Sequence, residues 1–227
     1  MTDNDEPTIN QVFAEFRAEL RDNLSERTFR GYRSALQLLG HCIDGYGPNH
    51  LTNPDRERWE EARDTKDPPR FSEVFGPEYI PRLFGEFLSY FMPRKVQPSK
   101  TLAKNAEKTV RKLRKWLVAN DYVDQSPSEP PRRSSNLVDA TELRTMLEDV
   151  TIGGSESNYP DFDEGHFYIR EVLDDTITVE RVVQPGTIEI SLPPEITEKC
   201  TENMAISGVI VRNDDTWCFL EVWNVYP

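Results

Sequence analysis

The sequence predicts an α+β protein, in which a helical part of four helices precedes a small, mostly antiparallel β domain with a short leading helix. Apolar residues recur at helical spacing through residues 8–123. From residue 166 onward they fall instead into short β-branched and aromatic runs separated by turn signals. Residues 124–136 are rich in proline and serine and predict a linker. We therefore expect a helical domain at 8–123 and, at 137–227, an acidic β-rich domain built as a barrel or a sandwich.

The first two helices carry recognisable start and stop signals. Thr8 and Gln11 form a capping-box pattern ahead of the first apolar stripe. Asn23 and Ser25 are alternative caps for the second helix. A Gly-Tyr-Gly-Pro stretch at 45–48 ends that helix.

A long connection rich in proline, asparagine and aspartate then leads to the last two helices. It contains a short predicted helix near 54–63. The third helix is expected at 77–91, after which Pro93 and Pro98 break the chain. The fourth helix is expected at about 99–120.

The β domain begins with a helix that a second capping-box pattern predicts, formed by Asp139 and Glu142. A further short helix is expected near 194–200, and the expected strands are 166–173, 176–183, 187–192, 205–212 and 217–225. Trp217, Phe219 and Trp223 alternate along the last strand and so share one face. We expect that face in the core, with an exposed groove for a partner as the alternative.

Charge is distributed unevenly between the two halves of a chain whose net charge is −13. Residues 1–133 hold 22 Lys and Arg against 21 Asp and Glu, a net charge of +1. Residues 134–227 hold 5 against 19, a net charge of −14. Nine basic residues fall within 94–115, where Glu107 is the one acid. This asymmetry predicts two modules with different partners.

The fourth helix has opposed apolar and basic faces. Its basic face consists of Lys100, Lys104, Lys108, Arg111, Lys112, Arg114 and Lys115. Lysines four residues apart repel each other by a few tenths of a kcal/mol per pair, so this face favours an anionic partner. We expect the phosphates of nucleic acid. The alternatives are a solvated face and a face that docks on the acidic C-terminal domain through ion pairs.

A second basic cluster opens the second helix. Arg27, Arg30 and Arg33 recur every three residues beside its apolar stripe. They could instead pair on the surface with Glu26 or Asp22. If they do not, two basic helices could clasp one duplex, and these three arginines join the seven residues above as candidate DNA contacts.

The order and motifs of the helices over about residues 8–125 resemble those of a known module. The second helix reads SERTFRGYRSALQLLG, the third IPRLFGEFLSYF, and the fourth KTLAKNAEKTVRKLRKWLVANDYV. The matching residues are Ser25, Thr28, Tyr32, Leu36 and Leu39, then Thr101, Leu113, Trp116, Leu117, Tyr122 and Val123. This part is similar to the N-terminal core-binding, SAM-like domain of tyrosine recombinases and phage-type integrases. The resemblance implies a four-helix SAM-like bundle whose second and fourth helices face the major groove.

The second domain departs from that family. Tyrosine recombinases carry a larger catalytic domain with an Arg, a Lys, a His-x-x-Arg motif and a late Tyr nucleophile. Here His166 is followed by Arg170, a spacing of four, and Tyr226 ends a strand-like stretch. We therefore assign no catalytic residue and expect a protein that is not an enzyme and does not cut DNA.

No cofactor or metal site is predicted. The acidic run Asp161, Asp163 and Glu164 ahead of His166 is conceivable as a carboxylate–histidine metal site. A solvated loop is the preferred interpretation, because no second group of ligands is spaced to complete such a site.

The remaining composition indicates a cytoplasmic protein. Cys42, Cys200 and Cys218 lie far apart without a CxxC pair, which is typical of reduced thiols. No signal peptide is visible, and no window approaches the about 18 apolar residues of a membrane span.

Together these observations predict a non-catalytic DNA-binding or accessory protein. Its helical domain would bind duplex DNA, and its acidic domain would be an interaction or regulatory module that binds a protein partner or self-associates. The alternative is a scaffold protein that binds no DNA, in which the basic helix pairs with the acidic domain. An enzyme acting through the β domain is a third and more distant possibility.

Overall fold

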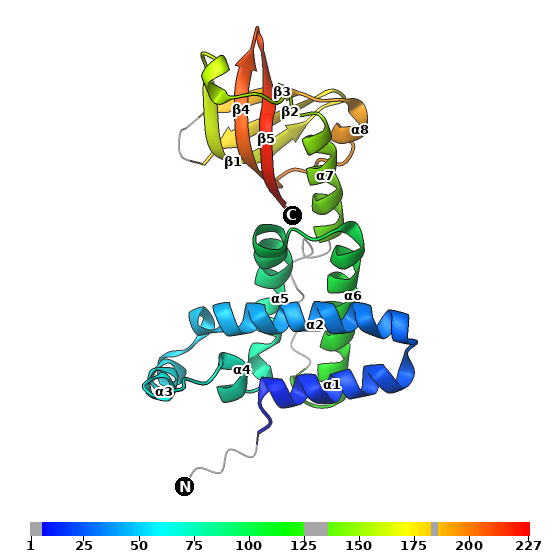
Figure 1. Ribbon diagram of the computed structural model, residues 1–227, viewed down its shortest axis with the longest axis vertical. Helices are drawn as coiled ribbons and strands as arrows, with labels where there is room; N and C mark the ends of the chain where they lie inside the picture. The colour runs from blue at the N-terminus through cyan, green and yellow to red at the C-terminus, as the bar shows by residue number, and fades with distance from the viewer. Residues whose placement is uncertain (1–5, 125–135, 183–185) are drawn as a thin grey trace. The chain divides into compact units, whose positions relative to one another are not determined.

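The structure, a computed structural model, describes residues 6–124, 136–182 and 186–227 (Figure 1). Its contacts divide the chain into two compact units. The helical unit comprises Met1–Phe91 and Lys104–Arg132, and the barrel unit comprises Met92–Ala103 and Arg133–Pro227. The protein is α+β, with helices preceding a five-stranded sheet, as predicted. Residues 125–135, nearly all of the predicted linker, lie outside the described residues.

The described chain before the linker is helical. Its elements are α1 (Ile9–Asn23), α2 (Glu26–Tyr46), η1 (Gly47–His50), α3 (Asn53–Arg63), α4 (Phe71–Val74), η2 (Pro77–Tyr79), η3 (Pro81–Leu83), α5 (Phe84–Glu86), η4 (Phe87–Val96) and α6 (Lys100–Ala119). The capping box of α1 is confirmed, because the Thr8 amide donates to Gln11 Oε1 at 2.7 Å and the Gln11 amide donates to Thr8 Oγ1 at 3.4 Å. Ser25 caps α2, since its Oγ accepts a hydrogen bond from the Thr28 amide at 3.4 Å.

The single helix predicted over 77–91 is instead a series of short segments with changing turn types. Pro77 and Pro81 each begin a 3₁₀ turn, where the missing N–H leaves no bond unmade. Pro93, expected to end the helix, lies inside η4, whose turns are π-type. A proline within an α-helix lacks the N–H for one i→i−4 bond and clashes with the preceding turn, and the wider turns of η4 give the ring more room.

The barrel unit holds α7 (Leu137–Asp149), η6 (Glu156–Asn158), β1 (Phe162–Val172), β2 (Thr176–Arg181), β3 (Thr187–Ser191), α8 (Pro194–Thr197), β4 (Ala205–Asn213) and β5 (Thr216–Tyr226). The strands close in the order β1-β2-β3-β5-β4, with β4 returning to pair with β1. All neighbours are antiparallel except β3 and β5. Of the two predicted alternatives the structure is therefore a barrel, of the five-stranded Greek-key class that includes the OB fold.

Helix α7 completes the barrel core with Ala140, Leu143 and Leu147. The capping box predicted from Asp139 and Glu142 is wrong. The helix begins at Leu137 instead, which places Asp139 inside the first turn. The Glu142 carboxylate instead forms ion pairs with Lys100 and Lys199.

The alternation predicted for the last strand is also wrong at Trp223. Phe219 is buried in the barrel core and Trp217 packs against it. The pairing of β4 with β5 shifts register twice, which turns Trp223 to the outside, where it packs on Val209, Val211 and Leu220. Gly208 permits this close pairing, because a Cβ there would lie 2.1 Å from the Glu221 carbonyl oxygen.

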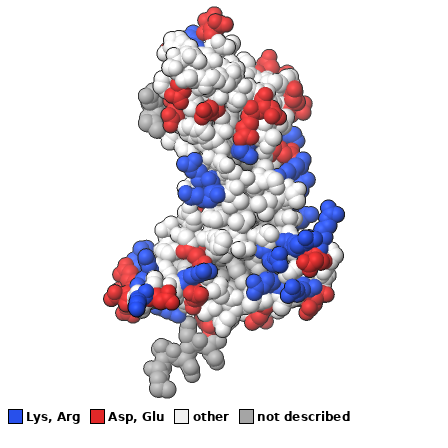
Figure 2. All heavy atoms as spheres, in the orientation of Figure 1, with Lys and Arg blue, Asp and Glu red and all other residues white. Residues whose placement is uncertain are grey.

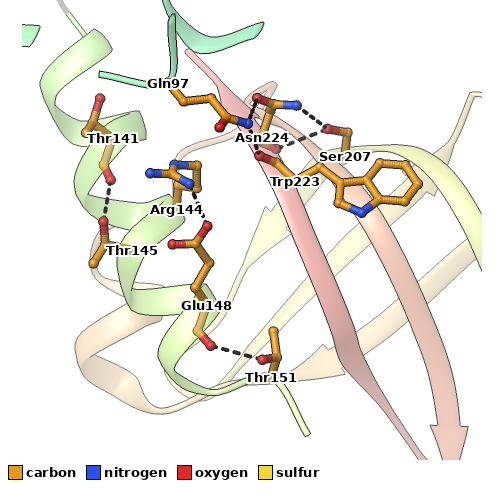
Figure 3. A network of polar contacts seen from close by, with 9 residues as sticks. All are labelled: Gln97, Thr141, Arg144, Thr145, Glu148, Thr151, Ser207, Trp223 and Asn224. Atoms are coloured by element: carbon orange, nitrogen blue, oxygen red, sulfur yellow. Dashed lines mark hydrogen bonds and ion pairs between the residues drawn. The ribbon is translucent and has the colours of Figure 1, made fainter. Parts of the chain in front are cut away.

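The segment Met92–Ala103 is bonded to the barrel through the exposed Gln97, whose partners on β5 include the buried Asn224 (Figure 3). Gln97 Nε2 donates to the Trp223 carbonyl and to Asn224 Oδ1, both at 3.3 Å. With its amide turned over, Asn224 would donate to the Pro93 carbonyl at 2.7 Å and accept from Arg94 Nη1 at 3.2 Å. The segment is bonded to Asn224 in either orientation, so residues from the helical half of the sequence help to complete the barrel unit.

Candidate nucleic-acid interface

One face of α6 presents cations without a carboxylate partner in the described part of the chain. Lys104, Lys108, Arg111 and Lys115 are exposed. Within the described parts of the chain none of the four forms an ion pair. The opposite face is buried and consists of Ala103, Ala106, Val110, Leu113 and Leu117. The opposition of faces predicted for this helix is therefore present.

The three other basic residues predicted on this helix are differently placed. Lys112 is half-buried, with Nζ 5.7 Å from the centre of the Tyr32 ring. Lys100 belongs to the barrel unit, where it forms an ion pair with Glu142. Arg114 is half-buried. The exposed basic face is therefore shorter than predicted.

Two lysines hold Glu142 in its ionised form. A hydrogen bond from Lys100 is the main cause that lowers the pKa of this carboxyl, and Lys199, at 3.5 Å, adds to the effect. Lys100 is thus neutralised within the barrel unit and contributes little to an anion-binding surface.

Close packing fixes α6 against the first two helices. A Cβ on Gly31 would lie 2.7 Å from Asn105 Nδ2, so glycine lets α2 and α6 approach closely. The Trp116 indole lies 5.2 Å from the Phe16 ring and donates to Glu19 Oε2 at 2.6 Å. These contacts orient the basic face of α6 relative to α2.

The three arginines predicted on α2 do not share one surface. Arg27 is exposed and forms no ion pair among the described residues, whereas Arg30 lies 4.0 Å from Glu26. The guanidinium carbon of Arg33 lies 6.0 Å from the centre of the Phe29 ring. At roughly 100° per residue, Arg27 lies about 40° around α2 from Gly31, whereas Arg33 lies about 160° away. Helical geometry therefore places Arg27, but not Arg33, on the side of α2 that crosses α6.

Sequence reasoning missed two cations on α1. Arg17 and Arg21 line hollows between α1 and α2. On the face drawn in Figure 2, basic side chains gather around the end of α1 and the start of α2. The available signal was the i,i+4 spacing of the two arginines, which place them on one side of the helix.

The barrel presents a different chemistry on β2 and β3. Members of the OB class bind oligonucleotides on this face, but a shared fold does not imply a shared ligand. The outward residues here are uncharged or acidic: Thr176, Thr178, Glu180, Thr187, Glu189 and Ser191. They offer neither cations for phosphates nor aromatic rings for bases.

The acidic run ahead of His166 is engaged in ion pairs. Asp163 lies 2.8 Å from Arg181, and Asp161 lies 3.8 Å from Arg212. No three His, Cys, Asp or Glu side chains gather as metal ligands in the parts of the chain that the structure describes. The His166 ring packs beside Tyr226, with centroids 5.7 Å apart.

Among the described helices, none combines the length and apolarity that crossing a membrane requires. No family model, curated protein or solved structure matches the chain.

Proposed function

We propose that the helical unit binds duplex DNA through the exposed face of α6 and the neighbouring Arg27, without cutting it. The observation that carries this proposal is the set of four exposed cations on α6 that form no ion pair with a carboxylate of the described residues. We name this surface, Arg27 with Lys104, Lys108, Arg111 and Lys115, the basic face. Its i,i+4 repulsions are unfavourable in the free protein, and phosphates would relieve them.

The resemblance to the core-binding, SAM-like domain of tyrosine recombinases supports the same ligand. In that family the second and fourth helices of the bundle face the major groove. The corresponding elements here are α2 and α6, which meet at Gly31 and Asn105. The acidic barrel unit then serves as an interaction or regulatory module, because its charge opposes contact with phosphates.

Duplex binding by the full chain tests this proposal. Fluorescence anisotropy with a labelled duplex of about 25 base pairs gives the association constant at several salt concentrations. Five phosphate contacts predict a slope of about −4.5 for log K against log salt. A full chain that binds no duplex at low salt, or binds with a slope near zero, overturns the proposal.

A second candidate, a scaffold protein that binds no DNA, is favoured by one contact. Lys100, the first residue of α6 and itself part of the barrel unit, pairs with Glu142. If the basic face served protein association, replacing Lys104 and Lys108 by glutamate would change the mass measured by light scattering. Under DNA binding the mass stays constant and the duplex affinity falls.

A further inference from the structure

A groove between α1 and α2 holds a second group of cations. Two adjoining hollows, of about 460 and about 480 Å³, share Ala14, Arg17 and Arg33 in their walls. Arg21 lines the first of them. We call this feature the arginine groove, after Arg17, Arg21 and Arg33.

Small side chains open the groove. Ala14 and Ala18 contribute only methyl groups from α1, and Gly40 contributes no side chain from α2. The helices therefore leave a depression whose walls are part polar and part apolar, and the longer arginine side chains line it. Both hollows fall within the range of about 300–1,000 Å³ typical of small-ligand sites.

Phe29 holds two of the guanidinium groups in place. The guanidinium carbons of Arg21 and Arg33 lie 5.4 and 6.0 Å from the centre of its ring, and Phe29 itself is buried. A guanidinium packed on an aromatic ring keeps its N–H donors available, since these lie in its own plane. Two guanidinium groups are thus positioned before a ligand binds, which reduces the conformational entropy lost on binding.

Carboxylates do not neutralise these arginines. Within the described residues, Arg17, Arg21 and Arg33 form no ion pair. Asp44 lines the groove, but its Oδ1 accepts a hydrogen bond from the Ser72 amide at 3.0 Å. The other carboxylate in the walls, Asp22, is exposed.

The acids of α1 that alternate with its arginines are engaged elsewhere. Glu19 accepts the Trp116 indole N–H, and Glu15 accepts the Tyr122 hydroxyl. The same hydrogen bond to Glu15 is the main cause that raises the pKa of Tyr122. Residues at the C-terminal end of α6 therefore occupy the carboxylates that could otherwise pair with Arg17 and Arg21.

We infer that the arginine groove binds adjacent phosphate groups of an anionic ligand, at a site separate from the basic face. A guanidinium group can donate two parallel hydrogen bonds to two oxygens of one phosphate. Three guanidinium groups line the same concave surface. The site lies across α2 from the crossing with α6, so it does not depend on DNA binding by the basic face. The phosphates could belong to a free polyphosphate or to a nucleic-acid backbone.

Calorimetric titration of the full chain with sodium tripolyphosphate, at about 150 mM salt to suppress weak surface binding, tests the inference. We expect Arg17→Gln/Arg21→Gln to weaken binding at least tenfold, because each charge-assisted bond contributes that order of affinity. Arg17→Lys/Arg21→Lys should bind more tightly than the glutamine variant but less tightly than the wild type, since lysine has the positive charge but not the paired donors of a guanidinium group. The matched control, Arg56→Gln/Lys66→Gln, removes the same charge from exposed positions on and after α3 and should bind as the wild type does.

Two results would overturn the inference: no tripolyphosphate binding by the wild type, or equal affinity in Arg17→Gln/Arg21→Gln. Circular dichroism and the melting temperature show that the variants fold. A competition with duplex DNA in the Lys104→Gln/Lys108→Gln background then identifies the source of the phosphates. Displacement of tripolyphosphate indicates a nucleic-acid backbone, and retention indicates a free anion.

Discussion

Replacing Lys104 and Lys108 by glutamine should weaken duplex binding in a strongly salt-dependent way. Both side chains are exposed on the basic face and have no carboxylate partner among the described residues. The change removes two positive charges and keeps the length and helix propensity of the side chains close to those of lysine. It also removes three i,i+4 repulsions, Lys100–Lys104, Lys104–Lys108 and Lys108–Lys112, so the free energy of unfolding should stay constant or rise by a few tenths of a kcal/mol per pair.

The size of the effect follows from the number of phosphates that the basic face neutralises. Five contacts give a slope of about −4.5, and three give about −2.7. Between 50 and 200 mM salt the wild type should therefore lose about 500-fold in affinity, and the double variant about 40-fold. At 50 mM salt the variant should bind about 200-fold more weakly, and the two lines should converge near 1 M.

Anisotropy titrations of both full-length proteins, at four or more salt concentrations, measure these slopes. Arg56→Gln/Lys66→Gln is the matched control, since it removes the same charge away from the basic face and should keep the wild-type slope. Parallel lines for the wild type and Lys104→Gln/Lys108→Gln would refute the reasoning. So would an equal reduction in slope for the control, because binding would then follow net charge and not a defined face.

Three further outcomes are expected. Gly208→Ala should destabilise the protein by about 3 kcal/mol in urea unfolding, because its Cβ would overlap the Glu221 carbonyl oxygen; an unchanged unfolding midpoint would contradict the close β4–β5 pairing. Glu142→Gln should cost about 1 kcal/mol or less at pH 7. Folding lowers the pKa of Glu142 below its usual 4.5. The stability that its ion pairs contribute is therefore present above pH 4.5 and is lost as the pH falls through the folded-state pKa. A loss of stability in Glu142→Gln that persists at pH 3 would exclude the ion pairs as its source. Burial raises the pKa of the Cys42 and Cys200 thiols, the latter to about 12, while Cys218 is half-exposed, so a thiol reagent at pH 8 should label one cysteine rapidly in the native protein and all three after unfolding.

The local patterns in the sequence were sufficient to predict α1, α2 and α6. Each has one apolar stripe that repeats over several turns, and α1 and α2 also have capping signals, so local preference and tertiary packing agree. The exposed part of the basic face could be predicted for the same reason. A helix that buries one side must present the other, and Lys104, Lys108, Arg111 and Lys115 all lie there.

Long-range contacts decided the features that the sequence did not reveal. Glu142 fits a capping box locally, but Lys100, some forty residues earlier, binds its carboxylate instead. The register shifts that turn Trp223 outward depend on the pairing of two whole strands. Likewise, the carboxylates of Glu15 and Glu19, which alternate with Arg17 and Arg21 along α1, accept hydrogen bonds from Tyr122 and Trp116, about a hundred residues later.

The attachment of Met92–Ala103 to the barrel has a consequence for the order in which the chain folds during synthesis. Its buried residues Met92, Pro93 and Pro98 leave the ribosome long before β5, the last strand, which holds Trp223 and Asn224. The bonds from Gln97 to β5 span 126 and 127 residues, so they form only after β5 has been synthesised. Until then this segment has no β5 to pack against. We therefore expect a protease to cleave it in chains stalled before β5 is made, but not in the folded protein.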